Sequence, residues 1–171
     1  MNHLHPIACL ALLAASCQST ASPRIVEADP DVRGELFERI QGLEGRWENS
    51  SPDGVSFHVF ELTAGGTVVR ETMFPGEDYE MVNMYTLDGN SVYMTHYCMA
   101  GNQPRMRATA ISGDSMEFKS VGVGDLKSPS EIYMGRMTLV FRGADHIEQR
   151  WISIGPDIPE EPTSFVLKRV P

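Results

Sequence analysis

The residues with the clearest chemical potential in this sequence are polar side chains set singly within alternating apolar segments. Each is flanked two positions away on both sides by an apolar, aromatic or sulfur-containing residue; the four are Glu71, Asn83, His96 and Gln149. Residues two apart in a strand point to the same face, so we expect these groups, with Trp151 beside Gln149, on the apolar inward face of a sheet. A bare buried polar group costs roughly 1–3 kcal/mol. The pattern therefore indicates either groups that pair around a wet, ligand-binding cavity or satisfied polar groups of a core.

The stretch "THYCMAGNQPRM", Thr95 to Met106, concentrates further reactive side chains. His96 and Cys98 would share a strand face, but residues two apart lie about 6.5–7 Å from each other, too far for direct proton transfer from the thiol. A zinc site needs three or four ligands, and the chain has neither CxxC nor HExxH to supply them. We therefore expect no metal and no Cys–His nucleophile here.

The segment "AGNQPR" within that stretch favours a turn. Gly101 and Asn102 tolerate a positive φ, and Pro104 is poorly suited to a central strand. We predict that Thr95–Cys98 ends a strand, that Met99–Pro104 forms an ordered corner at a barrel rim, and that Arg105 begins the next strand. The corner is either purely structural or presents Asn102, Gln103 and Arg105 to an anionic or carbonyl-bearing ligand.

Length and charge limit the alternatives. A chain of 171 residues suits one domain, and a net charge of −9 disfavours nucleic-acid binding, which needs a basic surface. No apolar run approaches the roughly 20 residues of a membrane-spanning helix.

The N-terminus has the pattern of an export signal. Ile7 to Ala15 is an apolar run followed by small residues, and its end, "LAASC", resembles the lipobox of bacterial lipoproteins, which would make Cys17 the lipidated first residue. Cleavage after Ala21 and a buried helix are the alternatives. We expect a signal peptide over 1–16, a flexible tether over 17–31 and one domain over 32–171. This implies export to the bacterial cell envelope, as an outer-membrane lipoprotein anchored by lipid or as a periplasmic or secreted protein.

The rest of the chain predicts an all-β fold. Leu36, Ile40 and Leu43 have helical spacing and Asp31 could cap them, which predicts one short helix ending near Gly42 or Gly45. Turn signals then separate about ten β-rich runs, which predict an antiparallel up-and-down meander closed into a barrel. The expected strands are 45–49, 55–63, 67–74, 79–87, 90–98, 105–112, 115–122, 132–142, 145–154 and 163–170.

A short helix running into "LEGRWE", with Gly45-x-Trp47 on the first strand, resembles the calycin superfamily of lipocalins, fatty-acid-binding proteins and nitrobindin-like barrels. The span from "LEGRW" through "THYCMAGNQPRM" to "IEQRW" is similar to uncharacterised bacterial secreted or lipoprotein domains with a lipocalin-like fold. The resemblance covers most of residues 38–170. It implies a ligand-binding lumen. We expect Trp47 to be a plug at the barrel base rather than a ligand contact. The histidine pattern of haem-binding nitrobindins is absent, so we expect no cofactor.

Three functions follow as hypotheses. The first is a barrel that binds a small hydrophobic or amphipathic ligand in its lumen. The second is an enzyme that uses Glu71 and His96 as an acid–base pair. The third is an envelope structural or interaction module, with a solid interior and an exposed apolar patch.

Overall fold

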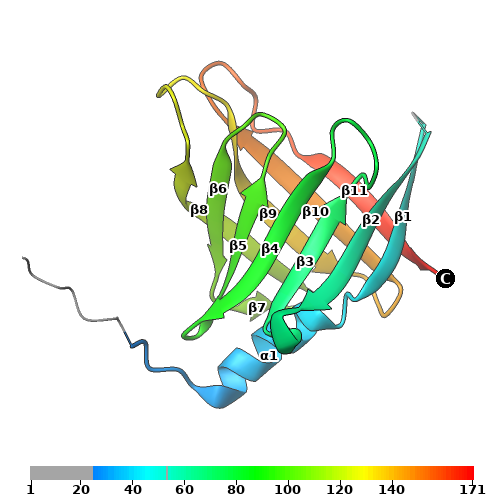
Figure 1. Cartoon of the computed structure of the whole chain (residues 1–171), viewed down its shortest axis with the longest axis vertical. Coiled ribbons are helices and arrows are strands. Elements are labelled where there is room, and N and C mark those ends of the chain that lie inside the picture. The colour runs from blue at the N-terminus through cyan, green and yellow to red at the C-terminus, as the bar shows by residue number, and fades with distance from the viewer. Residues whose placement is uncertain (1–24, 53) are drawn as a thin grey trace, which may run out of the picture.

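The computed structural model describes residues 25–52 and 54–171, and it confirms the all-β barrel with one short helix (Figure 1). The predicted signal peptide and Cys17 lie outside the described residues. Within the described part, no helix is both long and apolar enough to span a membrane.

The elements follow one another with short connections. They are α1 (Pro30–Gln41), β1 (Gly45–Ser51), β2 (Gly54–Thr63), the 3-10 turn η1 (Ala64–Gly66), β3 (Val68–Met73), β4 (Met81–Asp88), β5 (Ser91–Tyr97), β6 (Gln103–Ala108), β7 (Ile111–Ser112), β8 (Ser115–Gly124), β9 (Tyr133–Phe141), β10 (His146–Ile154) and β11 (Thr163–Val170).

The sheet closes on itself. Neighbours in sequence pair antiparallel from β1 to β6 and from β8 to β11, while β1 pairs with β11 and β6 pairs with β8. The two-residue β7 is a short continuation of the β6 path and pairs with β8. Closing the ring pairs the edge strands that an open sheet would expose to aggregation.

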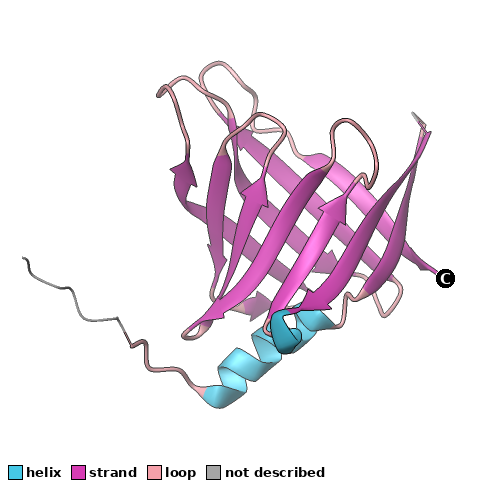
Figure 2. Ribbon diagram, viewed as in Figure 1, coloured by secondary structure: helices cyan, strands magenta, loops and turns pink. Residues whose placement is uncertain are grey.

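Helix α1 covers one end of this barrel (Figure 2). Its N-cap is Asp29, whose side chain accepts hydrogen bonds from the backbone N–H groups of Asp31 and Val32. The N-cap therefore lies two residues before the expected Asp31, because Pro30 suits a first helical position, where no N–H is needed. Its buried residues are Leu36, Phe37 and Ile40.

Trp47 seals the same end, as predicted. It is fully buried, and its Nε1 donates a 2.7 Å hydrogen bond to the carbonyl of Leu43 just after the helix. The guanidinium of Arg169, on β11, lies 4.3 Å from the centre of the indole ring and donates a hydrogen bond to the carbonyl of Gly42 at 2.8 Å. One aromatic ring thus joins the helix to both strands of the β1–β11 seam.

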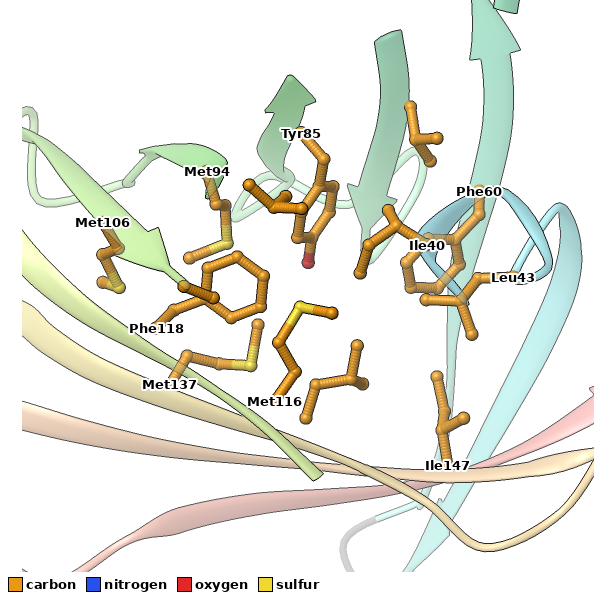
Figure 3. Close-up of a cluster of buried hydrophobic side chains, with 14 of the residues drawn as sticks. Ile40, Leu43, Phe60, Tyr85, Met94, Met106, Met116, Phe118, Met137 and Ile147 are labelled. Carbon is orange, nitrogen blue, oxygen red and sulfur yellow. The ribbon is translucent and has the colours of Figure 1, made fainter. Parts of the chain in front are cut away.

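The part of the lumen nearest the helix is filled with side chains (Figure 3). Sulfur-containing and aromatic residues dominate it, and they include Met94, Met106, Met116, Phe118 and Met137, each without exposed surface. Methionine fills irregular gaps well because it is unbranched and flexible. This half of the barrel is a packed core.

The predicted corner is shorter than expected. Strand β5 ends at Tyr97, and β6 begins at Gln103 rather than at Arg105. Pro104 is tolerated because pairing between β5 and β6 begins only at Arg105, so its missing N–H breaks no bond to β5. Within β6, Pro104 faces inward, whereas Arg105 and Arg107 lie on the outer face.

Candidate functional site

A row of polar side chains crosses the inner wall of the barrel. The register pairs Glu71 of β3 with Asn83 of β4, and Asn83 with His96 of β5. All three are buried, as is Gln149 on β10. The inward direction predicted for these four residues is therefore confirmed.

The carboxylate of Glu71 is the centre of this group. Its Oε1 accepts from Nδ1 of His58 on β2 and from Nε2 of Gln149, each at 2.7 Å. Its Oε2 accepts from Nδ2 of Asn83 and from the hydroxyl of Tyr85, again at 2.7 Å each. Four donors satisfy the roughly four acceptor positions of an ionised carboxylate. Since Gln149 lies on the far wall, the carboxylate also joins two sides of the barrel.

Two further side chains extend the network by one step. Nδ1 of His96 lies 2.7 Å from Oδ1 of Asn83, and Nε1 of Trp151 donates to Oε1 of Gln149 at 3.1 Å. The imidazole of His96 also lies against the indole of Trp151, with ring centres 4.9 Å apart. Trp151, expected beside Gln149, thus belongs to the same cluster.

Burial and hydrogen bonding have opposite effects on the pKa of the Glu71 carboxyl group. Burial raises the pKa of Glu71, but the hydrogen bond and charge of His58, together with hydrogen bonds from Asn83 and Tyr85, outweigh it, so the pKa falls below its ordinary value. Burial and the nearby carboxylate charge raise the pKa of Tyr85 well above its usual range. Burial lowers the pKa of His96 to about 4, against the opposing charge of Glu71. At neutral pH the network holds one ionised carboxylate and a neutral His96.

This arrangement bears on the acid–base hypothesis. Glu71 and His96 both face the lumen, as that hypothesis requires, but Asn83 lies between them. Both carboxylate oxygens of Glu71 are fully engaged by donors, so none is free to take a proton from a substrate. The geometry favours a fixed internal charge over a general base.

The two histidines each have a buried nitrogen left over. Nε2 of His58 and Nε2 of His96 have no hydrogen-bond partner within the described chain, although both are shielded from solvent. Buried polar atoms of this kind are uncommon, and each has an energetic cost. These two atoms are the places in the lumen where a ligand atom would gain a hydrogen bond.

Aromatic rings surround the His58 side of the cluster. The ring centres of Phe74 and Phe165 lie 5.4 Å and 5.3 Å from that of His58, and Tyr79 packs on Phe74 at 5.2 Å. Phe74 opens the β3–β4 loop with φ of 56°, a left-handed conformation that is unfavourable for a bulky side chain. We call Phe74, Tyr79 and Phe165 the aromatic cap.

The corner residues do not join the buried network. Nδ2 of Asn102 donates to Oε1 of Glu131 at 3.1 Å and to the carbonyl of Ile132 at 3.0 Å, which ties the corner to the β8–β9 loop. Gln103 donates to the carbonyl of Gly101 at 2.9 Å. The guanidinium of Arg105 lies outside the barrel, 4.2 Å from the ring centre of Tyr93. A ligand role for these three residues stays a prediction.

Sequence reasoning missed His58 and the role of Tyr85. In "VSFHVF" both alternating faces of β2 carry aromatic or branched residues, so periodicity does not say which way His58 points. Tyr85 was counted as an apolar neighbour of Asn83, although its hydroxyl needs a partner once buried. That need was the available signal. Among the described residues, no three His, Cys, Asp or Glu side chains are grouped so as to hold a metal ion.

We predict that Glu71→Gln lowers the free energy of unfolding by about 3–5 kcal/mol, because it removes one partner of a buried charge network and turns an amide toward existing donors. The matched control is Glu61→Gln, which breaks the exposed pair with Arg70 and should cost at most about 1 kcal/mol. Urea denaturation of both variants measures the difference. An equal decrease in the free energy of unfolding of both variants would contradict a larger contribution of the buried carboxylate to stability.

We also predict acid lability that depends on His96. Its pKa is about 4 in the folded protein and about 6.5 when unfolded. The unfolded chain therefore binds an extra proton between these values, and the free energy of unfolding falls as pH drops through that window, by about 3 kcal/mol in total. The lowered pKa of Glu71 adds a loss of the same sign at lower pH.

The measurement is urea denaturation of wild type and His96→Gln at intervals between pH 7 and pH 4. The variant should show the shallower pH dependence across this window. Parallel curves would contradict the assignment of this component to His96.

Comparison with known proteins supports the architecture alone. No protein-family model matches the sequence, and no curated protein matches it. Among solved structures, the crystal structure of Rv2717c from M. tuberculosis is similar, with a TM-score of 0.56 and 14% sequence identity over 85% of this chain and 100% of that one. A likeness at this identity shows a shared β-barrel fold.

Proposed function

We propose that this protein is an exported β-barrel that binds a small, partly apolar ligand at the His58–His96 end of its lumen. The observation that carries the proposal is the pair of buried Nε2 atoms without partners. A purely structural core would gain stability by replacing such groups with apolar ones. Their presence beside a buried charge therefore favours a binding role.

The surroundings suit an apolar body with one polar end. The aromatic cap packs on His58 and Trp151 packs on His96, so apolar surface adjoins both histidines. Because these side chains pack closely, a ligand has to displace part of the cap to enter. The left-handed backbone of Phe74 makes the β3–β4 loop the element that we expect to move.

Export and anchoring complete the proposal. Cys17 follows an apolar run and small residues in the lipobox-like "LAASC". A tether from residue 17 would reach α1, which lies at the opposite barrel end from the β3–β4, β5–β6 and β8–β9 loops (Figure 1). In an anchored protein, the aromatic cap would then face away from the membrane.

The second candidate function is an envelope interaction module, which the packed lumen favours. Apolar side chains exposed around the loop end of the barrel give it a possible contact surface; they are Tyr79, Tyr97, Met99, Leu126 and Ile132. This function requires no ligand, so a binding measurement separates it from the first.

We predict that the full chain binds the neutral fluorescent probe N-phenyl-1-naphthylamine saturably, at one site per chain. Phe74→Ala should raise the association rate severalfold, because it removes the ring that closes the route to His58. Phe141→Ala is the matched control: this phenylalanine lies at the helix end, near Arg39, and its removal should leave the rate unchanged. Stopped-flow fluorescence measures both rates. Absence of saturable binding would favour the interaction module.

We predict that Cys17 is the lipidated residue. In a bacterial host, metabolic labelling with radioactive palmitate should mark the mature protein, and Cys17→Ser should abolish the label. Cys9→Ser is the control, because that cysteine lies within the predicted signal peptide and should leave labelling intact. An unlabelled wild-type protein recovered from the soluble envelope fraction would instead indicate ordinary cleavage.

A further inference from the structure

We infer that the lumen selects a neutral ligand that donates a hydrogen bond, such as an aromatic alcohol, and discriminates against anions. This inference rests on the proposed function and adds the chemical class of the ligand. It follows from the direction in which every hydrogen bond of the buried network points.

The direction begins at Glu71. An ionised carboxylate can only accept hydrogen bonds, so each of its four partners must place a hydrogen toward it. Asn83 therefore presents its NH₂ group to Oε2, at 2.7 Å, which fixes the orientation of that amide. Its Oδ1 consequently faces His96.

The orientation of Asn83 fixes the tautomer of His96. Oδ1 of an amide is an acceptor, so the ring atom 2.7 Å from it, Nδ1 of His96, must carry the hydrogen. In a neutral imidazole the other nitrogen then has a free lone pair. Burial keeps His96 neutral at physiological pH. Nε2 of His96 is thus an acceptor without a donor.

His58 also directs a donor toward the carboxylate. Its Nδ1 donates to Oε1 of Glu71, and its Nε2 is likewise buried without a partner in the described chain. Trp151 points its N–H inward as well, toward Gln149. Each of these side chains directs a donor toward the carboxylate, and a lone pair is left at Nε2 of His96.

The charge of the lumen also disfavours an anionic ligand. The buried polar and charged side chains of the described chain include Glu71 but no lysine or arginine. Arg105, the cation expected near the mouth, lies on the outer face against Tyr93. A carboxylate or phosphate ligand would meet the like charge of Glu71, whereas a hydroxyl would satisfy the lone pair of His96. The rings of Trp151 and the aromatic cap favour a planar apolar body for the rest of the molecule.

The test compares three probes of nearly equal shape on the wild-type full chain at pH 7.5. The probes are 1-naphthol, which donates a hydrogen bond; 1-methoxynaphthalene, which cannot; and 1-naphthoate, which is anionic. Isothermal titration calorimetry gives each Kd. We expect 1-naphthol to bind about 10-fold or more tightly than the ether, the effect of one hydrogen bond to a buried acceptor, and 1-naphthoate to bind most weakly.

The outcomes separate this inference from the proposed function. Equal binding of 1-naphthol and 1-methoxynaphthalene, or tighter binding of 1-naphthoate, would overturn the donor preference and leave a ligand-binding barrel. Binding of N-phenyl-1-naphthylamine with none of the three would also overturn it. Failure of all four probes would remove the proposed function itself.

A pair of variants locates the acceptor. His96→Leu should reduce the 1-naphthol to 1-methoxynaphthalene affinity ratio to about one, because the lone pair is gone. His146→Leu, on the exposed side of β10, should keep the wild-type ratio. The wild-type comparison stands on its own if His96→Leu does not fold, and an unchanged ratio in a folded His96→Leu protein would overturn the role of His96.

Discussion

Enclosing one carboxylate is the constraint on which the rest of this structure depends. Moving an ionised group such as Glu71 out of water costs several kcal/mol even after the protein relaxes, so the fold must return that energy in hydrogen bonds. Three of its four partners come from β2 and β4, the neighbours of its own strand, and the fourth, Gln149, comes from the opposite wall. A register slip on any of these strands would turn a donor away from the carboxylate. The network therefore fixes the pairing of the strands as well as the chemistry of the lumen.

The same carboxylate divides the barrel into two parts. The hydroxyl of Tyr85 bonds to Glu71, while its ring packs on Phe118 with centres 5.8 Å apart. Below this boundary, toward α1, the interior holds methionines and aromatic rings (Figure 3). Above it lie the two histidines and the aromatic cap. The helix end is a packed core, and the loop end holds the two histidine nitrogens that have no hydrogen-bond partner within the described chain.

Alternation in the sequence predicted much of this, and its failures have physical reasons. Glu71, Asn83, His96 and Gln149 each interrupt one clearly apolar face, so their inward direction could be derived from period two alone. The inward direction of His58 was not predicted, because both faces of β2 carry aromatic or branched residues. Arg105 was expected near the mouth because Pro104 was assigned to the corner. Pro104 instead lies within β6 and faces inward, so strand alternation directs Arg105 outward. The polar groups that meet across the lumen are determined by how the sheet closes into a barrel. The periodicity of the sequence does not describe that closure.

The seam between β1 and β11 has a consequence for how the chain folds. Arg46 pairs with Val170, so contacts at this seam join the two ends of the barrel sequence. Pairings of such high contact order form late, since the whole intervening chain must be ordered first. During synthesis, β3 emerges well before β10, and the Glu71 carboxylate stays hydrated until Gln149 arrives from the other wall. We therefore expect a slow folding step in which barrel closure and dehydration of this charge occur together.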